Sequence, residues 1–157
     1  MRLTAAQIRA SVIRLFEAED TACFSEFTVK TGRRLDLICL AADGLITAVE
    51  IKSSVADFRS DQKWQTYLEW ADQFYFAVSD EFPSEILPNV DIAGCIISDG
   101  FDAVIDRPAP LTKLAGARRN SLIKQLARRS MRRATRLSGD DDVLLAAVMR
   151  SGDQTRG

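Results

Sequence analysis

The sequence contains no histidine, and its three cysteines, Cys23, Cys39 and Cys95, lie far apart without a Cys-x-x-Cys pair. The absence of histidine excludes Ser–His–Asp and Cys–His nucleophiles and every zinc site that needs an imidazole ligand. The cysteine spacing argues against a disulfide framework or a thiolate zinc site, and we expect all three to be small buried hydrophobes in a reducing compartment. Catalysis would therefore depend on carboxylates, Lys, Tyr, Ser or a metal held by oxygen ligands.

Long apolar runs are also missing, because no stretch approaches the roughly 18 residues that a membrane span needs. The N-terminus opens a helix punctuated by polar residues rather than a signal peptide. We therefore expect a cytoplasmic protein that does not contact a membrane. The 157 residues fit one domain, since domains run about 100–200 residues.

Positive charge is concentrated in one segment of the chain. The sequence has 21 basic and 22 acidic side chains and a formal net charge of −1. Residues 1–112 hold ten basic and eighteen acidic side chains, whereas residues 113–136 hold nine basic and no acidic ones. This asymmetry indicates a polyanionic partner rather than a property of the fold.

Hydrophobic periodicity predicts an alternation of helices and strands. One capping box opens a helix over residues 4–20, and a second opens a helix over residues 54–71. A long basic helix is expected over residues 112–137, followed by a short helix over 143–150. The expected strands cover residues 24–30, 35–41, 45–52, 74–78, 94–98 and 103–106.

Two of these strands, residues 35–41 and 45–52, are apolar on both faces, so a layer must cover each side of the sheet. The predicted fold class is α/β, a three-layer-like sandwich with a central mixed sheet flanked by helices. We expect residues 1–137 to form a single domain that includes the basic helix. Residues 138–157 are expected to form a short C-terminal helix and a flexible tail.

Charged residues that suggest chemistry lie at the ends of the same two strands. Glu50 and Lys52 share one face of their strand because side chains alternate. If the turn at 42–44 holds three residues, Asp36 lies directly opposite Glu50. A two-residue turn would instead pair Asp36 with Ile51 and scatter the charges over both faces. The apolar pattern allows either register.

In the first register two carboxylates would lie side by side, and they repel unless a proton or a cation intervenes. Oxygen ligands suit Mg²⁺ or Mn²⁺, to which Asp36 and Glu50 would offer carboxylates and Ile51 its backbone carbonyl. Such an ion activates water and offsets charge on a phosphoryl group, while Lys52 can orient that water. This set suffices for phosphodiester hydrolysis without histidine. The alternative is a solvated strand end with a weak salt bridge.

The order of an acid, a hairpin, Glu50-Ile51-Lys52, a helix and a strand resembles the PD-(D/E)XK nuclease superfamily, whose core would cover about residues 4–78. Leu35 stands where the superfamily motif has proline. Residues 24–136 also resemble the bacterial MmcB-type family of DNA-repair endonucleases. The stretches that carry this resemblance are EFT (26–28), TGRRLDL (31–37), VEIKSS (49–54), DFRSDQKW (57–64), Tyr67, DQFYFAV (72–78), SDG (98–100) and ARR (117–119).

The resemblance implies a restriction-endonuclease-like fold and metal-dependent cleavage of DNA. In this reading Asp36 and Glu50 are metal ligands and Lys52 is the catalytic lysine. A supporting acid is also implied, and Glu26 has the family-like spacing for it. Glu19, on the apolar face of the first expected helix, is the alternative.

Further cationic and aromatic side chains are candidate nucleic-acid contacts. Arg33 and Arg34 are expected to contact phosphate or to pair with the acids. Lys63 and Tyr67, four residues apart on the second expected helix, either approach the scissile phosphate or belong to the surface and the core. Asp57 and Asp61 are expected to cap the start of that helix and to be solvated there, rather than to bind a metal.

The basic helix has one almost purely cationic face, with apolar residues on the other. A stripe of one charge sign is typical of polyanion contact, and a solvated face or a membrane surface are the alternatives. The cationic residues are Lys124, Arg128, Arg129, Arg132, Arg133 and Arg136.

Together with the resemblance, the sequence predicts a Mg²⁺- or Mn²⁺-dependent, nucleoid-associated endonuclease that hydrolyses DNA, acts in DNA repair and needs no organic cofactor. The alternative is a catalytically inactive nuclease-fold module that binds nucleic acid or a repair partner. RNA as the substrate and a homodimer as the active unit stay open.

Overall fold

The computed structural model describes residues 2–139 of the chain. The chain divides after Arg118 into two compact units, and each is described by itself. The expected single domain over residues 1–137 stays a prediction. The helix expected over residues 143–150 and the tail after it lie outside the described residues.

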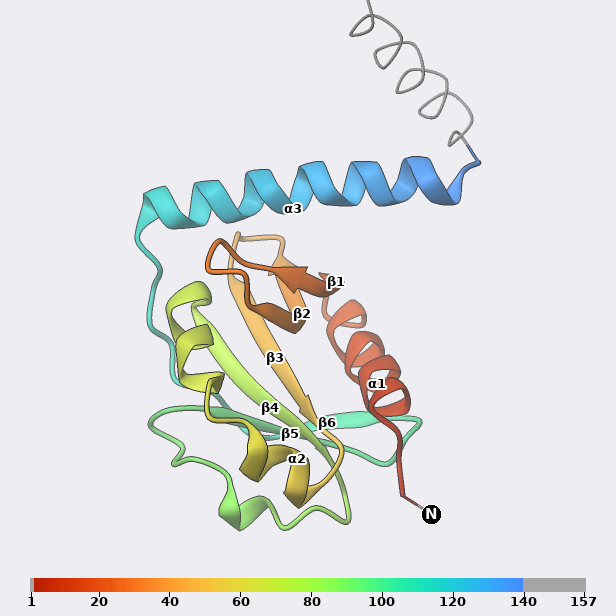
Figure 1. The fold of residues 1–157 in the computed structure, drawn as a ribbon, viewed down its shortest axis with the longest axis vertical. Helices are drawn as coiled ribbons and strands as arrows, with labels where there is room; N and C mark the ends of the chain where they lie inside the picture. The colour runs from red at the N-terminus through yellow and green to blue at the C-terminus, as the bar shows by residue number, and fades with distance from the viewer. Residues whose placement is uncertain (1, 140–157) are drawn as a thin grey trace, which may run out of the picture. The chain divides into compact units, whose positions relative to one another are not determined.

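The first unit is built on a six-stranded sheet with the strands in chain order (Figure 1). Neighbours β3–β4 and β4–β5 are parallel, and the other pairs are antiparallel. This mixed sheet, flanked by helices, confirms the predicted α/β class. The strands are β1 (Thr21–Thr28), β2 (Arg34–Ala41), β3 (Ile46–Lys52), β4 (Gln73–Ser79), β5 (Gly94–Ser98) and β6 (Ala103–Arg107). The helices are α1 (Ala5–Glu17), α2 (Val55–Ser60), the short 3-10 helices η1 (Trp64–Trp70) and η2 (Ser84–Ile86), and α3 (Gly116–Leu137).

The β2–β3 hairpin has the register that places the acids together. Leu37 pairs with Val49, and the turn between the strands holds three residues. Gly44 in this turn has a φ of 89°, a conformation that glycine adopts without steric cost. One step beyond the Leu37–Val49 pair, Asp36 lies opposite Glu50. Of the two registers that the apolar pattern allowed, the structure has the one with the three-residue turn.

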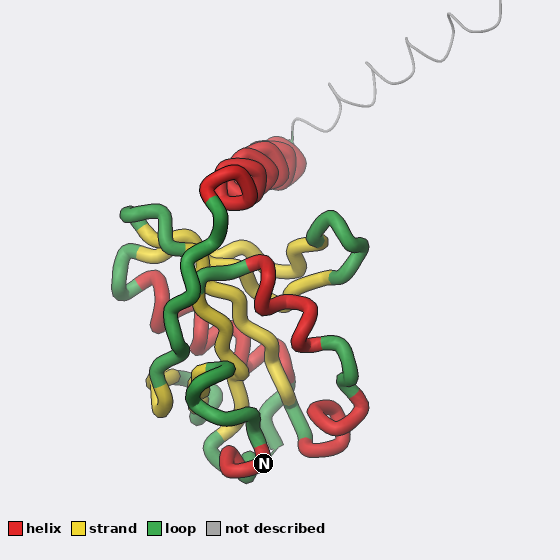
Figure 2. The backbone as a smooth tube through the Cα atoms, turned by 90° about the vertical axis from the view of Figure 1, so that its left-hand side faces the viewer, coloured by secondary structure: helices red, strands yellow, loops and turns green. Residues whose placement is uncertain are grey.

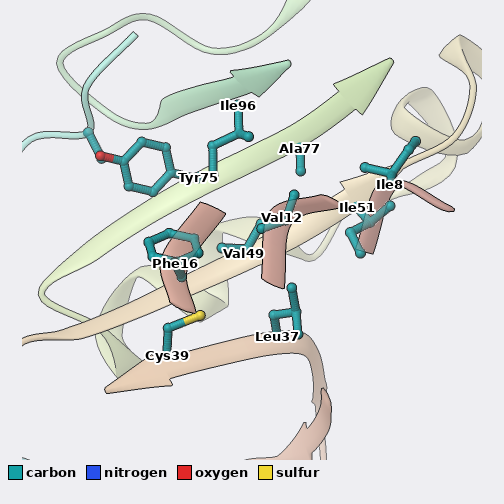
Figure 3. Close-up of a cluster of buried hydrophobic side chains, with 11 residues drawn as sticks. Ile8, Val12, Phe16, Leu37, Cys39, Val49, Ile51, Tyr75, Ala77 and Ile96 are labelled. Atoms are coloured by element: carbon teal, nitrogen blue, oxygen red, sulfur yellow. The ribbon is translucent and has the colours of Figure 1, made fainter. Parts of the chain in front are cut away.

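Helix α1 covers one face of the sheet with a helical stripe of apolar side chains (Figure 3). Ile8, Val12 and Phe16, spaced four residues apart, are buried against Leu37 of β2 and Val49 of β3, among others. The capping box at the helix start forms as expected, because the Thr4 side chain accepts from the backbone of residue 7. Burial of side chains of this size contributes about 1.5–3 kcal/mol each.

The opposite face of the sheet is covered by aromatic side chains of α2 and η1. Ring centroids of Phe58 and Trp64 lie 5.5 and 5.3 Å from that of Phe76 in β4. Phe74, on the same strand, lies 5.1 Å from Phe76. Helical segments therefore lie on both sides of the strands (Figure 2), as two-sided apolar strands require.

The helix expected over residues 54–71 is interrupted, so that prediction was wrong. Ser54 caps α2 by accepting from the Asp57 N–H, but the helix ends at residue 60. There Asp61 Oδ1 accepts the Lys63 N–H at 2.8 Å, a local turn that competes with helix formation. Lys63 precedes η1 instead of sharing a helix with Tyr67, so the two residues do not share the expected helical face.

Asp72 explains why α3 begins at Gly116 and not at residue 112. Its carboxylate accepts the N–H groups of Ile46 and Leu114, each at 2.8 Å, and its carbonyl accepts the Thr112 N–H. These bonds hold residues 112–114 in an extended path along the start of β3. Asp72 is only 2% exposed, so its contacts are made away from water.

All three cysteines are free, and Cys39 and Cys95 are buried as predicted. Cys23 is half-buried, and its Sγ lies 3.2 Å from Cys39 Sγ across the β1–β2 pair. Among residues 2–139 no helix combines the length and apolarity needed to cross a bilayer.

Candidate active site

Asp36 and Glu50 are joined across the end of the β2–β3 hairpin. Glu50 Oε1 accepts the Asp36 N–H at 3.2 Å, and Asp36 Oδ2 accepts the Ile51 N–H at 2.8 Å. Each carboxylate thus takes a backbone donor of the opposite strand, just past the last pair of the ladder. The structure therefore brings together the two acids that the sequence singled out.

The two carboxylates lie in a poorly hydrated corner. Glu50 is 5% exposed and has the aromatic Phe76 as its register partner on β4. Burial, together with the charge of Asp36, raises the pKa of Glu50 to about 8. Burial also raises the pKa of Asp36, although the Ile51 N–H and the Lys52 charge act in the opposite direction. Two adjacent carboxyl groups with raised pKa values can both ionise only if a cation compensates their negative charge.

Lys52 lies on the same face, one pleat beyond Glu50, as alternation predicted. Its Nζ is 4.0 Å from Glu50 Oε2 but only 2.6 Å from Asp61 Oδ2. Burial acts to raise the pKa of Asp61, but the hydrogen bonds from Lys52 and from two backbone N–H groups hold it below the ordinary value. The expectation of a solvated Asp61 was therefore wrong. The sequence signal for this position of Asp61 is the Asp61-Gln62-Lys63 stretch, in which the aspartate accepts the Lys63 N–H and ends the helix.

Tyr67 reaches the site from η1 and is 9% exposed. Its hydroxyl donates to the Arg34 carbonyl at 3.0 Å, which fixes the start of β2. Burial and the charges of Glu50, Asp61 and Asp36 raise the pKa of Tyr67 to about 12. Tyr67 therefore belongs to the core, which was one of the two positions expected for it. Its hydroxyl lies at the edge of the core, near Asp36, Glu50 and Asp61.

The basic candidates near the two acids are Arg33, Arg34 and Lys63. Within residues 2–139, neither Arg33 nor Arg34 forms an ion pair with Asp36 or Glu50, so the expected pairing is not observed. Arg34 is exposed and Arg33 half-buried, and Lys63 is exposed at the start of η1.

Glu26 occupies an irregular point of β1. Its neighbours Ser25 and Phe27 pair with Leu37 and Leu35, and the ladder skips Glu26 and Asp36 between them. Glu26 has a φ of 59°, which is uncommon for a residue with a side chain and interrupts the ladder. Its side chain is 50% exposed and forms an ion pair with Arg9 of α1 at 3.7 Å. Arg9 had not been identified as a site residue.

The alternative supporting acid, Glu19, lies beyond the end of α1. The helix ends at Glu17, and Glu19 belongs to the exposed turn that follows. Its assignment to the apolar face of the helix was wrong, because the helix is shorter than the periodicity indicated.

The donor set fits a hydrated divalent cation. Among residues 2–139 no group of three or more Asp, Glu, Cys or His side chains is placed to hold a metal. Two carboxylates and a backbone carbonyl would leave the remaining positions to water, as Mg²⁺ commonly requires. When ionised, Asp36, Glu50 and Asp61 carry three negative charges against one positive charge on Lys52. One divalent cation would balance the remaining two.

Several other residues of the family-like stretches have structural partners. Ser98 Oγ accepts the Gly100 N–H and lies 2.6 Å from Ser11 Oγ, which ties β5 to α1. Asp99 Oδ1 accepts two backbone N–H groups in the β5–β6 turn. The Arg118 guanidinium lies over Trp70, 4.7 Å from the ring centroid. These residues shape the fold and not the acidic corner.

Helix α3 carries the predicted cationic side chains, while its buried residues are Leu122 and Leu126. Lys124, Arg128, Arg132 and Arg136 follow one another at four-residue spacing and are exposed. Arg133 is exposed and Arg129 half-buried. No acidic side chain interrupts this segment.

Comparison with known proteins places the chain in a family. A family model described as DNA repair protein MmcB-like matches residues 2–141. The solved structure of the SPO1766 protein of unknown function from Silicibacter pomeroyi is similar, with a TM-score of 0.81 and 42% sequence identity, covering 88% of this chain and 94% of that chain. None of the curated proteins compared with the chain matches it. Because the family model spans most of the sequence, the chain belongs to the MmcB-like family of DNA repair proteins.

Proposed function

We propose that the chain is a metal-dependent DNA endonuclease of the PD-(D/E)XK type. The observation that carries this proposal is the meeting of the half-buried Asp36 with the buried Glu50 and Lys52 at one end of the β2–β3 hairpin. Glu50 accepts the Asp36 N–H, Asp36 accepts the Ile51 N–H, and the Lys52 ammonium lies 4.0 Å from Glu50 Oε2. Membership in a family of DNA repair proteins supports DNA as the substrate.

Asp36 and Glu50 would hold Mg²⁺ or Mn²⁺, and the Ile51 carbonyl is the proposed additional ligand. When bound, the ion supplies a water of lowered pKa and offsets the charge that develops on the phosphoryl group. Lys52 would orient the attacking water or donate to the phosphoryl oxygens. Glu26 stays the proposed supporting acid, because the residues on either side of it pair with the neighbours of Asp36.

The protein would bind DNA through the phosphates of the DNA backbone and would not recognise a base sequence. The cationic face of α3 supplies charge of one sign, which suits phosphate contacts. Arg33, Arg34 and Lys63 are proposed as further phosphate contacts close to the acids. Tyr67 would serve the site by fixing the Arg34 carbonyl, with its phenol near the scissile group.

The proposal is tested by cleavage of supercoiled, branched and damaged DNA with Mg²⁺ or Mn²⁺. We expect D36A, E50A and K52A each to lower the rate roughly 100-fold or more while the far-ultraviolet circular dichroism is unchanged. The matched control is D43N, which alters an exposed acid in the β2–β3 turn. Absence of cutting by the wild-type protein on all these substrates with both metals contradicts the proposal.

A second candidate is a non-catalytic nucleic-acid-binding module. It is favoured by the burial of Glu50 and Lys52, both 5% exposed, and by the Lys52–Asp61 ion pair. A module of this kind would bind DNA through the cationic face of α3 but show no saturable Mn²⁺ binding. Calorimetric titration with Mn²⁺ separates the two candidates without relying on a particular DNA substrate.

A further inference from the structure

The Lys52 ammonium is bonded to Asp61 and not to Glu50. Its Nζ is 2.6 Å from Asp61 Oδ2, within hydrogen-bond range, and 4.0 Å from Glu50 Oε2, beyond it. Lys52 is 5% exposed, so bulk water does not compensate the charge of its ammonium group. The position of the ammonium is therefore decided by which carboxylate holds it.

Asp61 is itself fixed by the backbone. Its Oδ1 accepts the Lys63 N–H at 2.8 Å, and the Trp64 N–H also reaches the carboxylate. The side chain of Asp61 is 17% exposed, and Trp64 is packed among Phe74 and Phe76. The turn after α2 thus presents one carboxylate oxygen to Lys52 in a defined position, with the other oxygen used locally.

We propose that Asp61 is a positioning residue that holds the Lys52 ammonium away from Glu50 and so leaves the Glu50 carboxylate to a divalent cation. Without Asp61, Glu50 is the nearest carboxylate to the ammonium. A direct Lys52–Glu50 ion pair would then compete for the oxygen that a metal needs. The catalytic meaning of this role rests on the proposed function, whereas the placement of the ammonium does not.

The first test needs neither metal nor DNA. The ¹⁵Nζ signal of Lys52 in the wild-type protein is identified by its loss in K52M. We expect a coupling through the hydrogen bond from Lys52 ¹⁵Nζ to Asp61 ¹³Cγ, and slow proton exchange of the buried ammonium. A Lys52 signal without this coupling, or with a coupling to Glu50 ¹³Cδ, overturns the proposal. Because this measurement uses the wild-type protein, it stands even if a variant fails to fold.

The second test compares Mn²⁺ affinity by calorimetry in five proteins: the wild type, D61N, D99N, K52M and K52M/D61N. D61N keeps an oxygen for the Lys63 N–H but turns an amide toward Lys52, and we expect it to weaken Mn²⁺ binding roughly 10-fold. The matched control is D99N, since Asp99 Oδ1 also accepts backbone N–H groups two and three residues ahead but contacts no lysine. D99N should bind Mn²⁺ as the wild type does.

The double variant distinguishes positioning from support of the turn. If the displaced ammonium is the competitor, K52M/D61N should bind Mn²⁺ within about twofold of K52M alone. Equal weakening by D61N with and without Lys52 would assign Asp61 a structural role and overturn the proposal. In a cleavage assay D61N should lower kcat and leave the KM for DNA unchanged.

Failure of the proposed function would look different from failure of this inference. A wild-type protein that binds no Mn²⁺ and cuts no DNA contradicts the nuclease, while the coupling of Lys52 to Asp61 still decides the placement of the ammonium. A wild-type nuclease whose D61N variant keeps the Mn²⁺ affinity and the Lys52 signal contradicts only the role of Asp61.

Discussion

Replacing Glu50 by glutamine is expected to remove most of the pH dependence of folding stability between pH 5 and pH 8. Burial and the charge of Asp36 raise the pKa of Glu50 from 4.5 to about 8 in the folded protein. In this window the folded chain keeps a proton that the unfolded chain releases. The free energy of unfolding therefore falls as the pH rises, and the contribution is complete only below the unfolded pKa.

The size of the effect follows from these two pKa values. A tenfold change in proton affinity corresponds to about 1.4 kcal/mol, so the wild type should lose on the order of 3–4 kcal/mol between pH 5 and pH 8. This is a large part of the roughly 5–15 kcal/mol that stabilises a domain. The chain offers a clean background, because it has no histidine to titrate in the same window.

The assay is urea unfolding in the presence of a chelator, followed by the fluorescence of the buried Trp64 and Trp70. E50Q should match the wild type within about 1 kcal/mol at pH 5 and exceed it by a few kcal/mol at pH 8. The control E69Q changes a carboxyl group whose side chain is 73% exposed and should follow the wild-type curve. Adding Mg²⁺ at 100 times its Kd should raise the free energy of unfolding of the wild type by about 2.7 kcal/mol at pH 8.

Parallel pH profiles of E50Q and the wild type would refute this reasoning, because they would show that Glu50 is ionised in the folded protein at no cost. A wild-type stability that rises from pH 5 to pH 8 would contradict the sign of the effect. Stabilisation of E50Q by Mg²⁺ to the same extent as the wild type would place the metal elsewhere.

Three further predictions concern parts of the chain outside the acidic corner. D72N should lower the free energy of unfolding by about 2 kcal/mol in urea titrations, because its amide must face one of the two N–H groups that the carboxylate accepts; an unchanged midpoint would contradict this. G94A should destabilise the protein by about 1–3 kcal/mol, since an added Cβ would collide with the Tyr75 ring and with neighbouring backbone, and wild-type stability would show that the strands can separate there. R128A/R132A should lower the slope of log affinity for duplex DNA against log salt by about 2, and fluorescence anisotropy at several salt concentrations that gives an unchanged slope would exclude the cationic face of α3 as the contact.

The sequence narrowed the hairpin to two registers, and the three-residue turn in the structure decides between them. Gly44 permits the three-residue turn, and strands that are apolar on both faces require cover on each side. With the turn fixed, side-chain alternation places Asp36, Glu50 and Lys52 on one face. These are short-range consequences of chain geometry.

The partners of those residues were not predictable, because they depend on where the chain returns in space. Asp61 lies nine residues after Lys52, and the apolar spacing of residues 64–71 favours one continuous helix over the turn that is observed. The position of Glu26 depends on a φ of 59° that no spacing rule indicates. Periodicity reports which face is apolar and does not report where a polar side chain interrupts a helix or a ladder.

The central claim is that Asp36 and Glu50 bind one divalent cation between them. Anomalous diffraction from a crystal soaked in Mn²⁺ measures this directly. The account predicts a single peak about 2.1 Å from one oxygen of each carboxylate, with Lys52 still bonded to Asp61. A crystal without a peak at these two carboxylates, or with manganese bound only at other acids, would contradict it.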